Sequence, residues 1–151
     1  MILSACKNGA DSIPELSTMV FNALKAQKQS MLSQCEPSTD EMEKAFEFYL
    51  SDTTHTKEAR KRDALDKTAS VKMSLNQGFA NVERGAIERK IDWSKTSIKD
   101  FKYVVSDHKE NYKDAKVRII IATGSMKNVI LYNAYLFGNR WYLMSDLAWE
   151  E

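Results

Sequence analysis

The sequence predicts an α+β domain in which N-terminal helices pack on a curved antiparallel sheet of about four strands. Apolar residues recur at helical spacing up to about residue 95 and alternate as they do in strands after that point. A glycine near the C-terminus separates two of these strand-like segments, so the last two strands are expected to form a tight antiparallel hairpin. Helices followed by such a sheet bury one face of each layer against the other.

The first helix is expected to begin at Ser12-Ile13-Pro14-Glu15. Ser12 can cap the helix, Glu15 stands three residues later as in a capping box, and proline is tolerated in the first turn. The apolar stripe that follows comprises Ile13, Leu16, Val20, Leu24 and Met31. The helix is expected to end at Cys35-Glu36-Pro37, because the residue before a proline is disfavoured in a helix.

A second helix is predicted after the capping box Ser38-Thr39-Asp40-Glu41. Its apolar residues keep to one helix face and are Met42, Ala45, Phe46, Tyr49 and Leu50. A third helix is predicted from about Lys57, ending at Gly78 or continuing to Gly85. Its inward-facing residues are expected to be Leu65, Ala69, Met73 and Leu75.

Four segments read as strands, and they are residues 98–105, 117–123, 128–137 and 140–147. The segment 117–123 is apolar on both faces, so it is expected to be a central strand. Gly138 at the first loop position suits a type II′ turn between the last two strands. That turn places Tyr135 opposite Tyr142.

Composition limits the classes of function. The 22 basic and 21 acidic residues give a net charge of +1, so no overall field attracts nucleic acid. No run of 18 apolar residues is present that would span a bilayer. Two cysteines and two histidines lie at scattered positions without metal-ligand spacing, so no metal or other cofactor is expected. The length suffices for one domain with a core, which is assigned to residues 12–151.

Leu3-Ser4-Ala5-Cys6 resembles a bacterial lipobox, the signal at which a lipoprotein is cut and its cysteine acylated. The small residues suit a narrow protease site, and the Cys6 thiol is the nucleophile that takes the lipid. Residues 1–11 are therefore interpreted as a lipobox remnant and a polar tether. The resemblance implies a protein of the bacterial cell envelope, attached to the membrane through acylated Cys6. The alternatives are an unmodified cytoplasmic chain that starts at Met1, or a Cys6–Cys35 disulfide in an oxidising compartment.

Two further segments resemble small bacterial lipoproteins of unknown function, namely Ile91-Asp92-Trp93-Ser94-Lys95 and Phe137-Gly138-Asn139-Arg140-Trp141-Tyr142-Leu143. Over roughly residues 38–149 the arrangement is similar to the nuclear-transport-factor-2-like cone or to its cystatin-like variant. The resemblance implies a conical sheet wrapped on helices, with a pocket at the mouth of the cone. It implies no single activity, because such folds host enzymes, binding proteins and assembly modules alike.

The best polar constellation combines an amide, two phenols, one cation and one carboxylate on the last hairpin. Its members are Asn133, Tyr135, Arg140, Tyr142 and Asp146. Such a set either lines a ligand pocket or forms the partly solvent-exposed outer face of the sheet, and the outer face is the favoured interpretation. Asp107-His108, the adjacent acid–histidine pair, is expected in a solvated loop and not in a catalytic site.

These observations predict a non-enzymatic, lipid-anchored envelope protein that binds a partner protein or a small ligand. The enzymatic alternative is an isomerase or dehydratase that uses the cone pocket, with Tyr135, Arg140, Tyr142 and Asp146 as the residues to test. The third alternative is a cytosolic protein-binding module, which requires Met1 to be the native start.

Overall fold

The computed structural model describes residues 7–48, 56–109 and 112–151. Its elements in chain order are α1 (Ile13–Lys25), the 3-10 helix η1 (Gln29–Gln34), α2 (Thr39–Phe48), α3 (Lys57–Glu88), the 3-10 helix η2 (Trp93–Lys95), β1 (Thr96–Lys109), β2 (Tyr112–Thr123), β3 (Met126–Phe137) and β4 (Arg140–Trp149). The predicted class is confirmed, because three N-terminal helices pack against a four-stranded antiparallel sheet.

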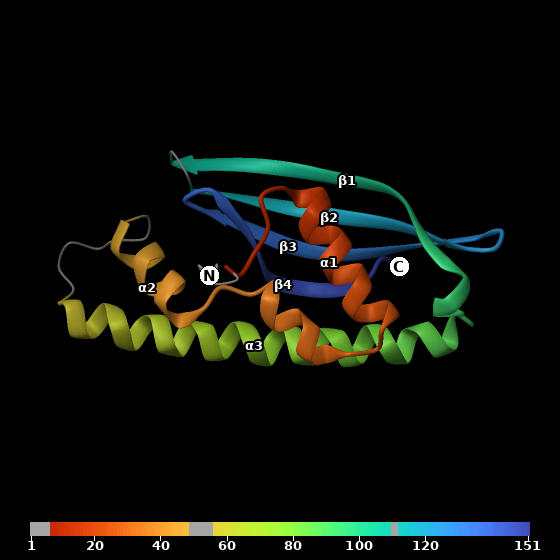
Figure 1. The fold of residues 1–151 in the computed structure, drawn as a ribbon, viewed down its shortest axis with the longest axis horizontal. Helices are drawn as coiled ribbons and strands as arrows, with labels where there is room; N and C mark the ends of the chain where they lie inside the picture. Colours follow the sequence, from red (N-terminus) through yellow and green to blue (C-terminus); the bar gives the residue numbers. More distant parts are fainter. Residues whose placement is uncertain (1–6, 49–55, 110–111) are drawn as a thin grey trace, which may run out of the picture.

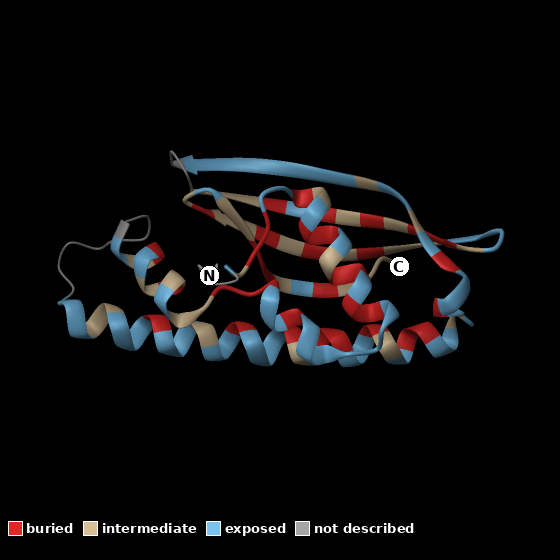
Figure 2. Ribbon diagram, viewed as in Figure 1, coloured by how far each residue is buried: buried red, intermediate tan, exposed pale blue. Residues whose placement is uncertain are grey.

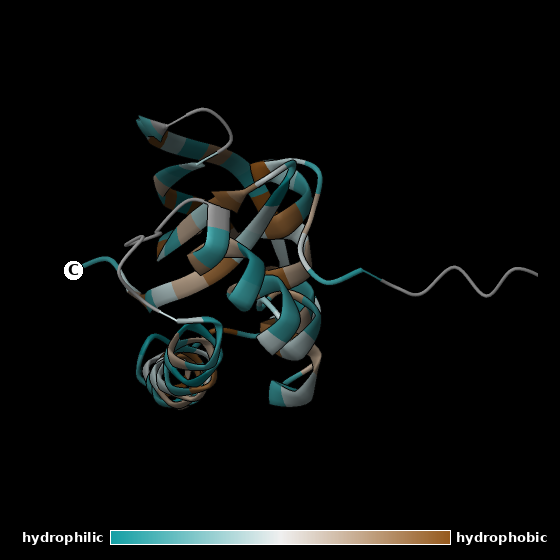
Figure 3. Ribbon diagram, turned by 90° about the vertical axis from the view of Figure 1, so that its left-hand side faces the viewer, coloured by the Kyte–Doolittle hydropathy of each residue, from teal (hydrophilic) through white to brown (hydrophobic). Residues whose placement is uncertain are grey.

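The sheet is a meander in which each strand pairs antiparallel with the next, in the order β1-β2-β3-β4. Helix α1 crosses one face of the sheet, and the long α3 runs beside β4 at the lower edge of Figure 1. Figure 3, in which α3 is seen end-on, shows this helix below the strands, and α3 also contacts α1. The face toward α1 is called the covered face below, and the opposite face is called the open face.

The covered face forms one core together with residues of α1, η1, α2 and α3. Its strand residues are buried and comprise Ala115, Val117, Ile119, Ile121, Ile130, Tyr132, Ala134 and Leu143. Helix α1 adds Leu16, Val20 and Leu24, which are fully buried. The hydroxyl oxygens of Ser17 and Tyr132 lie 2.6 Å apart, so this buried polar pair is satisfied within the core. Figure 2 shows buried positions along α1 and the inner strands, whereas most of β1 is exposed.

Helix α1 begins as predicted, because the Ser12 side chain accepts a hydrogen bond from the backbone N–H of Glu15. The predicted continuation to Cys35 is wrong, since α1 ends at Lys25. Gln27 adopts a φ of 54°, a left-handed conformation that stops a helix, and the chain resumes as η1. This turn changes the phase of the apolar spacing. Met31 is therefore 37% exposed and lies outside the predicted stripe.

Helix α2 confirms the second capping box. The backbone N–H of Ser38 donates to Glu41 Oε2 at 2.8 Å, and the backbone N–H of Glu41 donates back to Ser38 Oγ at 3.2 Å. Met42 and Ala45 are buried as predicted, and Phe46 packs partly buried against the core. The remaining members of the predicted face, Tyr49 and Leu50, lie outside the described residues.

Helix α3 is continuous through both glycines at which it was predicted to end. Its predicted inward face is wrong except for Leu75, since Leu65, Ala69 and Met73 are exposed. The buried positions are Ala64, Val71, Leu75, Gly78, Phe79, Val82, Gly85 and Ala86. A Cβ at Gly78 would lie 2.6 Å from the backbone oxygen of Leu147, so this glycine permits close packing on β4. Among the described helices, none combines the length and the apolar character needed to cross a bilayer.

All four predicted strands are confirmed, and β2 is central as predicted. The loop predicted at Asp107-His108 is wrong, because β1 continues through both residues, although their side chains are exposed. The final hairpin is confirmed by a φ of 64° at Gly138 and by the pairing of Tyr135 with Tyr142.

Candidate functional site

The open face carries a hollow of about 700 Å³, called the sheet hollow below. Its lining residues are Lys102, Tyr103, Val104, Lys116, Val117, Arg118, Leu131, Tyr132, Asn133, Asp146 and Ala148. The register explains how distant residues meet there. Successive partners across the four strands form the row Lys102, Arg118, Leu131 and Ala148. Directly paired residues point to the same face of an antiparallel sheet, so this row and the neighbouring row Val104, Lys116 and Asn133 line one surface.

The charge of the sheet hollow is mainly positive. Arg118 Nε and Nη2 donate to the two carboxylate oxygens of Glu150, at 2.8 and 2.6 Å. These hydrogen bonds and the charge of Glu150 raise the pKa of the Arg118 guanidinium. Lys102 and Lys116 form no ion pair with any residue in the described part of the chain. Among the described residues, the site therefore presents one cation that already holds a carboxylate and two that do not.

On the β4 side of the sheet hollow, uncharged side chains donate hydrogen bonds to the carboxylate of Asp146. Asn133 Nδ2 and Ser145 Oγ both donate to Asp146 Oδ2. The register shifts around Asn133, and Asp146 has a φ of 58°, so β4 bulges at this point. The bulge brings the Asp146 carboxylate over Asn133, where it is held by neighbouring side chains.

Tyr135 lies in an adjoining hollow of about 290 Å³ that it shares with Asp114 and Asn133. Burial raises the pKa of the Tyr135 phenol, and the charges of Asp114 and Asp146 raise it further. His108 Nε2 lies 3.0 Å from Asp114 Oδ2, but both side chains are more than a third exposed. A contact so open to water contributes little to stability.

Arg140 and Tyr142 do not join this site. Arg140 holds the segment 7–11, called the strap below. Its guanidinium donates to the backbone oxygens of Asn8 and Gly9 at 3.2 and 2.7 Å, and to Asp11 Oδ1 at 2.6 Å. Ala10 also exchanges two backbone hydrogen bonds with Trp141, so the strap lies along the edge of β4.

Tyr142 is 4% exposed and lies beneath the strap. Gly9 passes so close that a Cβ there would lie 2.7 Å from Cε1 of Tyr142. Burial raises the pKa of Tyr142 to about 12, with a further contribution from Glu41 and an opposing one from Arg140. Of the five predicted site residues, Asn133, Tyr135 and Asp146 therefore lie together on the open face, while Arg140 and Tyr142 contact the strap.

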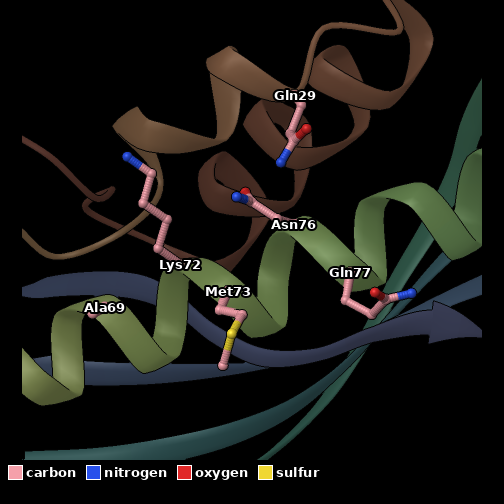
Figure 4. Close-up of a pocket in the computed structure, with 6 residues that line it drawn as sticks. All are labelled: Gln29, Ala69, Lys72, Met73, Asn76 and Gln77. Carbon is pink, nitrogen blue, oxygen red and sulfur yellow. The ribbon is translucent and has the colours of Figure 1, made fainter.

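A third hollow, of about 520 Å³, lies between η1 and α3. Figure 4 shows Gln29 reaching from η1 toward Asn76 on α3, with Lys72 one turn earlier on α3. An adjacent hollow includes the buried Glu36, whose pKa is raised by burial and lowered in part by Lys72. Its neighbour Cys35 is a free, buried thiol. Three amides and a single cation, Lys72, line the hollow between η1 and α3, whereas the sheet hollow has three cations.

Sequence reasoning missed Lys102, Lys116 and Arg118. A signal for two of them is present, because Lys116-Val117-Arg118-Ile119 alternates charged and apolar residues as a strand with one open face does. The strand prediction started at residue 117 and so left this alternation out. Leu131 and Ala148 carry no such signal, since the pairing of β2 with β3 places Leu131 beside Arg118, and the pairing of β3 with β4 places Ala148 beside Leu131.

The sheet hollow combines three cations with an apolar floor, an arrangement that can bind an anionic or amphipathic molecule. Its lining contains no histidine or cysteine, and its one carboxylate is held by an amide and a hydroxyl. Within the described ranges, no group of three or more His, Cys, Asp or Glu side chains is placed to hold a metal ion. No protein-family model, curated protein or solved structure matches this chain.

Proposed function

We propose that this chain is a lipid-anchored bacterial envelope protein whose domain binds a ligand on the open face of its sheet without catalysing a reaction. The observation that carries the binding half is the sheet hollow. It places apolar residues such as Leu131 and Ala148 beside Lys102 and Lys116, which have no ion-pair partner in the described chain. A concave surface with an apolar floor and a few polar groups is typical of ligand sites.

The anchoring half rests on Leu3-Ser4-Ala5-Cys6, which precedes the strap. Acyl chains on Cys6 would supply the membrane affinity, at about 0.8 kcal/mol for each buried methylene. Because the strap is bonded to β4 and Arg140, a lipid on Cys6 would hold the domain close to the bilayer. The proposed relatives are the small lipoproteins with cone-like or cystatin-like domains, and helices that precede an antiparallel sheet support this assignment.

The anchoring half is tested by expressing the chain with its native upstream DNA and separating membranes from soluble protein. We expect the wild-type chain in the membrane fraction, with an N-terminal peptide that begins at Cys6 and carries the mass of acyl groups. Cys6→Ser should move the protein to the soluble fraction. Cys35→Ser is the matched control and should stay with the membrane, because Cys35 is buried in the core.

Two results would contradict the anchor. One is an unmodified N-terminal peptide that starts at Met1, which would favour a cytosolic binding module. The other is a Cys6→Ser protein that remains with the membrane, which would assign the attachment to a partner protein or to the surface of the domain.

A further inference from the structure

We infer that the sheet hollow binds an amphipathic monocarboxylate, whose carboxylate replaces that of Glu150 on Arg118 and whose apolar chain lies over Val104, Leu131 and Ala148. The inference rests on the binding half of the proposed function and names the ligand class. Three features of the open face support it: the geometry at Arg118, the excess of cations around it and the exposed apolar floor.

Arg118 already binds a carboxylate. Its Nε and Nη2 each donate to one oxygen of Glu150, which is the bidentate geometry that a planar guanidinium offers to a carboxylate. Glu150 reaches it from a backbone position just beyond β4, where its N–H donates to the oxygen of Val129 at 2.8 Å. Glu150 thus shows which group this part of the sheet hollow accepts.

The contact between Arg118 and Glu150 is open to exchange. The two side chains are 42% and 34% exposed, so water competes for both charges. A carboxylate from solution can make the same two hydrogen bonds to Arg118. When a ligand carboxylate replaces that of Glu150 on Arg118, the Glu150 carboxylate becomes hydrated by water. The ligand also gains the free energy of the apolar contacts that its chain makes with the floor.

The surrounding charge favours an additional anion. Lys102 is the cross-strand neighbour of Arg118, and Lys116 lies two residues before it on the same face of β2. Against these three cations stand Glu150 and Asp146, and Asp146 already accepts hydrogen bonds from Asn133 and Ser145. An excess of positive charge in a concave site attracts an anionic ligand and orients it.

The floor requires an apolar ligand body. Val104 is 72% exposed on the edge strand β1, and Leu131 and Ala148 are only half-buried. Covering these side chains removes apolar surface from water. The volume of about 700 Å³ falls in the range of small-molecule sites, so one carboxylate with a single alkyl chain fits the space.

The test measures binding of decanoate, below the concentration at which it forms micelles, to the full chain carrying Cys6→Ser. Calorimetry gives affinity, and amide chemical shifts locate the ligand. We expect saturable binding with shifts on Lys102, Arg118 and Leu131. Arg118→Gln should weaken binding about tenfold, whereas Glu150→Gln should strengthen it about threefold because the competing carboxylate is gone. Arg62→Gln, the same type of change on an exposed part of α3, should leave the affinity unchanged.

Each contrary outcome overturns the inference. Equal affinity for decanoate and 1-decanol would leave only an apolar patch with no role for Arg118. Weaker binding in Glu150→Gln would make Glu150 part of the site and not a competitor. Chemical shifts confined to η1 and α3 would place the ligand in the hollow between those two helices. If decanoate does not bind at all, this ligand class is excluded, while the anchoring of the protein is decided separately by the Cys6→Ser fractionation.

Discussion

Ile119 and Ile120 are neighbours on β2 that point to opposite faces of one sheet. Ile119 is fully buried under α1, whereas Ile120 lies half-buried on the open face. The same contrast recurs on β3, where Ile130 is fully buried and Leu131 lines the sheet hollow. Side chains that alternate along each strand therefore serve two different faces of the sheet. The covered face holds the helices to the sheet, and the open face keeps cations and apolar side chains accessible.

The largest effect that separates the two faces is expected from matched isoleucine substitutions. Ile119→Ala removes fully buried methyl and methylene groups and should lower the free energy of unfolding by about 2–5 kcal/mol. Ile120→Ala changes strand propensity equally but should cost about 1 kcal/mol or less, because that side chain is partly in water. Urea denaturation of both variants measures the difference. Equal losses would mean that something covers the open face in solution.

A second comparison uses two phenols on β3. Tyr132 is 1% exposed and its hydroxyl is bonded to Ser17, whereas Tyr135 is half-buried beside the hollow on the open face. Tyr132→Phe leaves the Ser17 hydroxyl without its partner and should cost about 1–3 kcal/mol of stability. Tyr135→Phe is the control and should cost less.

The double variant sharpens the assignment of that cost. If the loss in Tyr132→Phe comes from the stranded Ser17 hydroxyl, adding Ser17→Ala should recover part of it, since both polar groups are then gone. Losses that simply add would show that the two hydroxyl groups are not coupled. The measurement is again the free energy of unfolding of the single variants and the double variant.

Local signals were sufficient for much of the fold. The capping box at Ser38 and the glycine at position 138 act within a few residues, and both predictions are confirmed. The inward face of α3 was wrong because it is chosen by packing on β4 and not by the helix itself. Val71 and Leu75 face the core, while Met73, equally apolar, is 72% exposed. A single turn at Gln27 likewise ended α1 without any proline or glycine to announce it.

The candidate site was predicted only in part, because a bulge in β4 and contacts between distant parts of the chain decide which residues meet. Alternation along an ideal β4 places Arg140, Tyr142 and Asp146 on one face, but the bulge near Asp146 interrupts that alternation. The partner of Arg140 is the strap, more than 120 residues away in sequence, and no local pattern encodes that contact. The cations of the sheet hollow likewise depend on the pairing of β1 with β2.

The covered side should also respond to alkaline pH, through a buried thiol. Cys35 is fully buried in the core, and burial, with a smaller contribution from Glu36, raises the pKa of its thiol from 9.0 to about 12. Below pH 9 the thiol is protonated in both states, so its contribution to stability is fully present. Between pH 9 and 12 the unfolded chain loses the proton while the folded chain keeps it, so stability falls as pH rises.

Cys35→Ala in a Cys6→Ser background isolates this contribution. The variant should be less stable than its parent at pH 8, because a buried side chain is truncated, but it lacks the titrating thiol. The gap between the two should therefore narrow by about 1 kcal/mol between pH 8 and pH 10. Urea denaturation at both pH values measures the gap. A constant gap would mean that the Cys35 thiol is as accessible to water in the folded chain as in the unfolded one. That result would mean that this part of the core is exposed to water like the open face, and is not buried like the covered face.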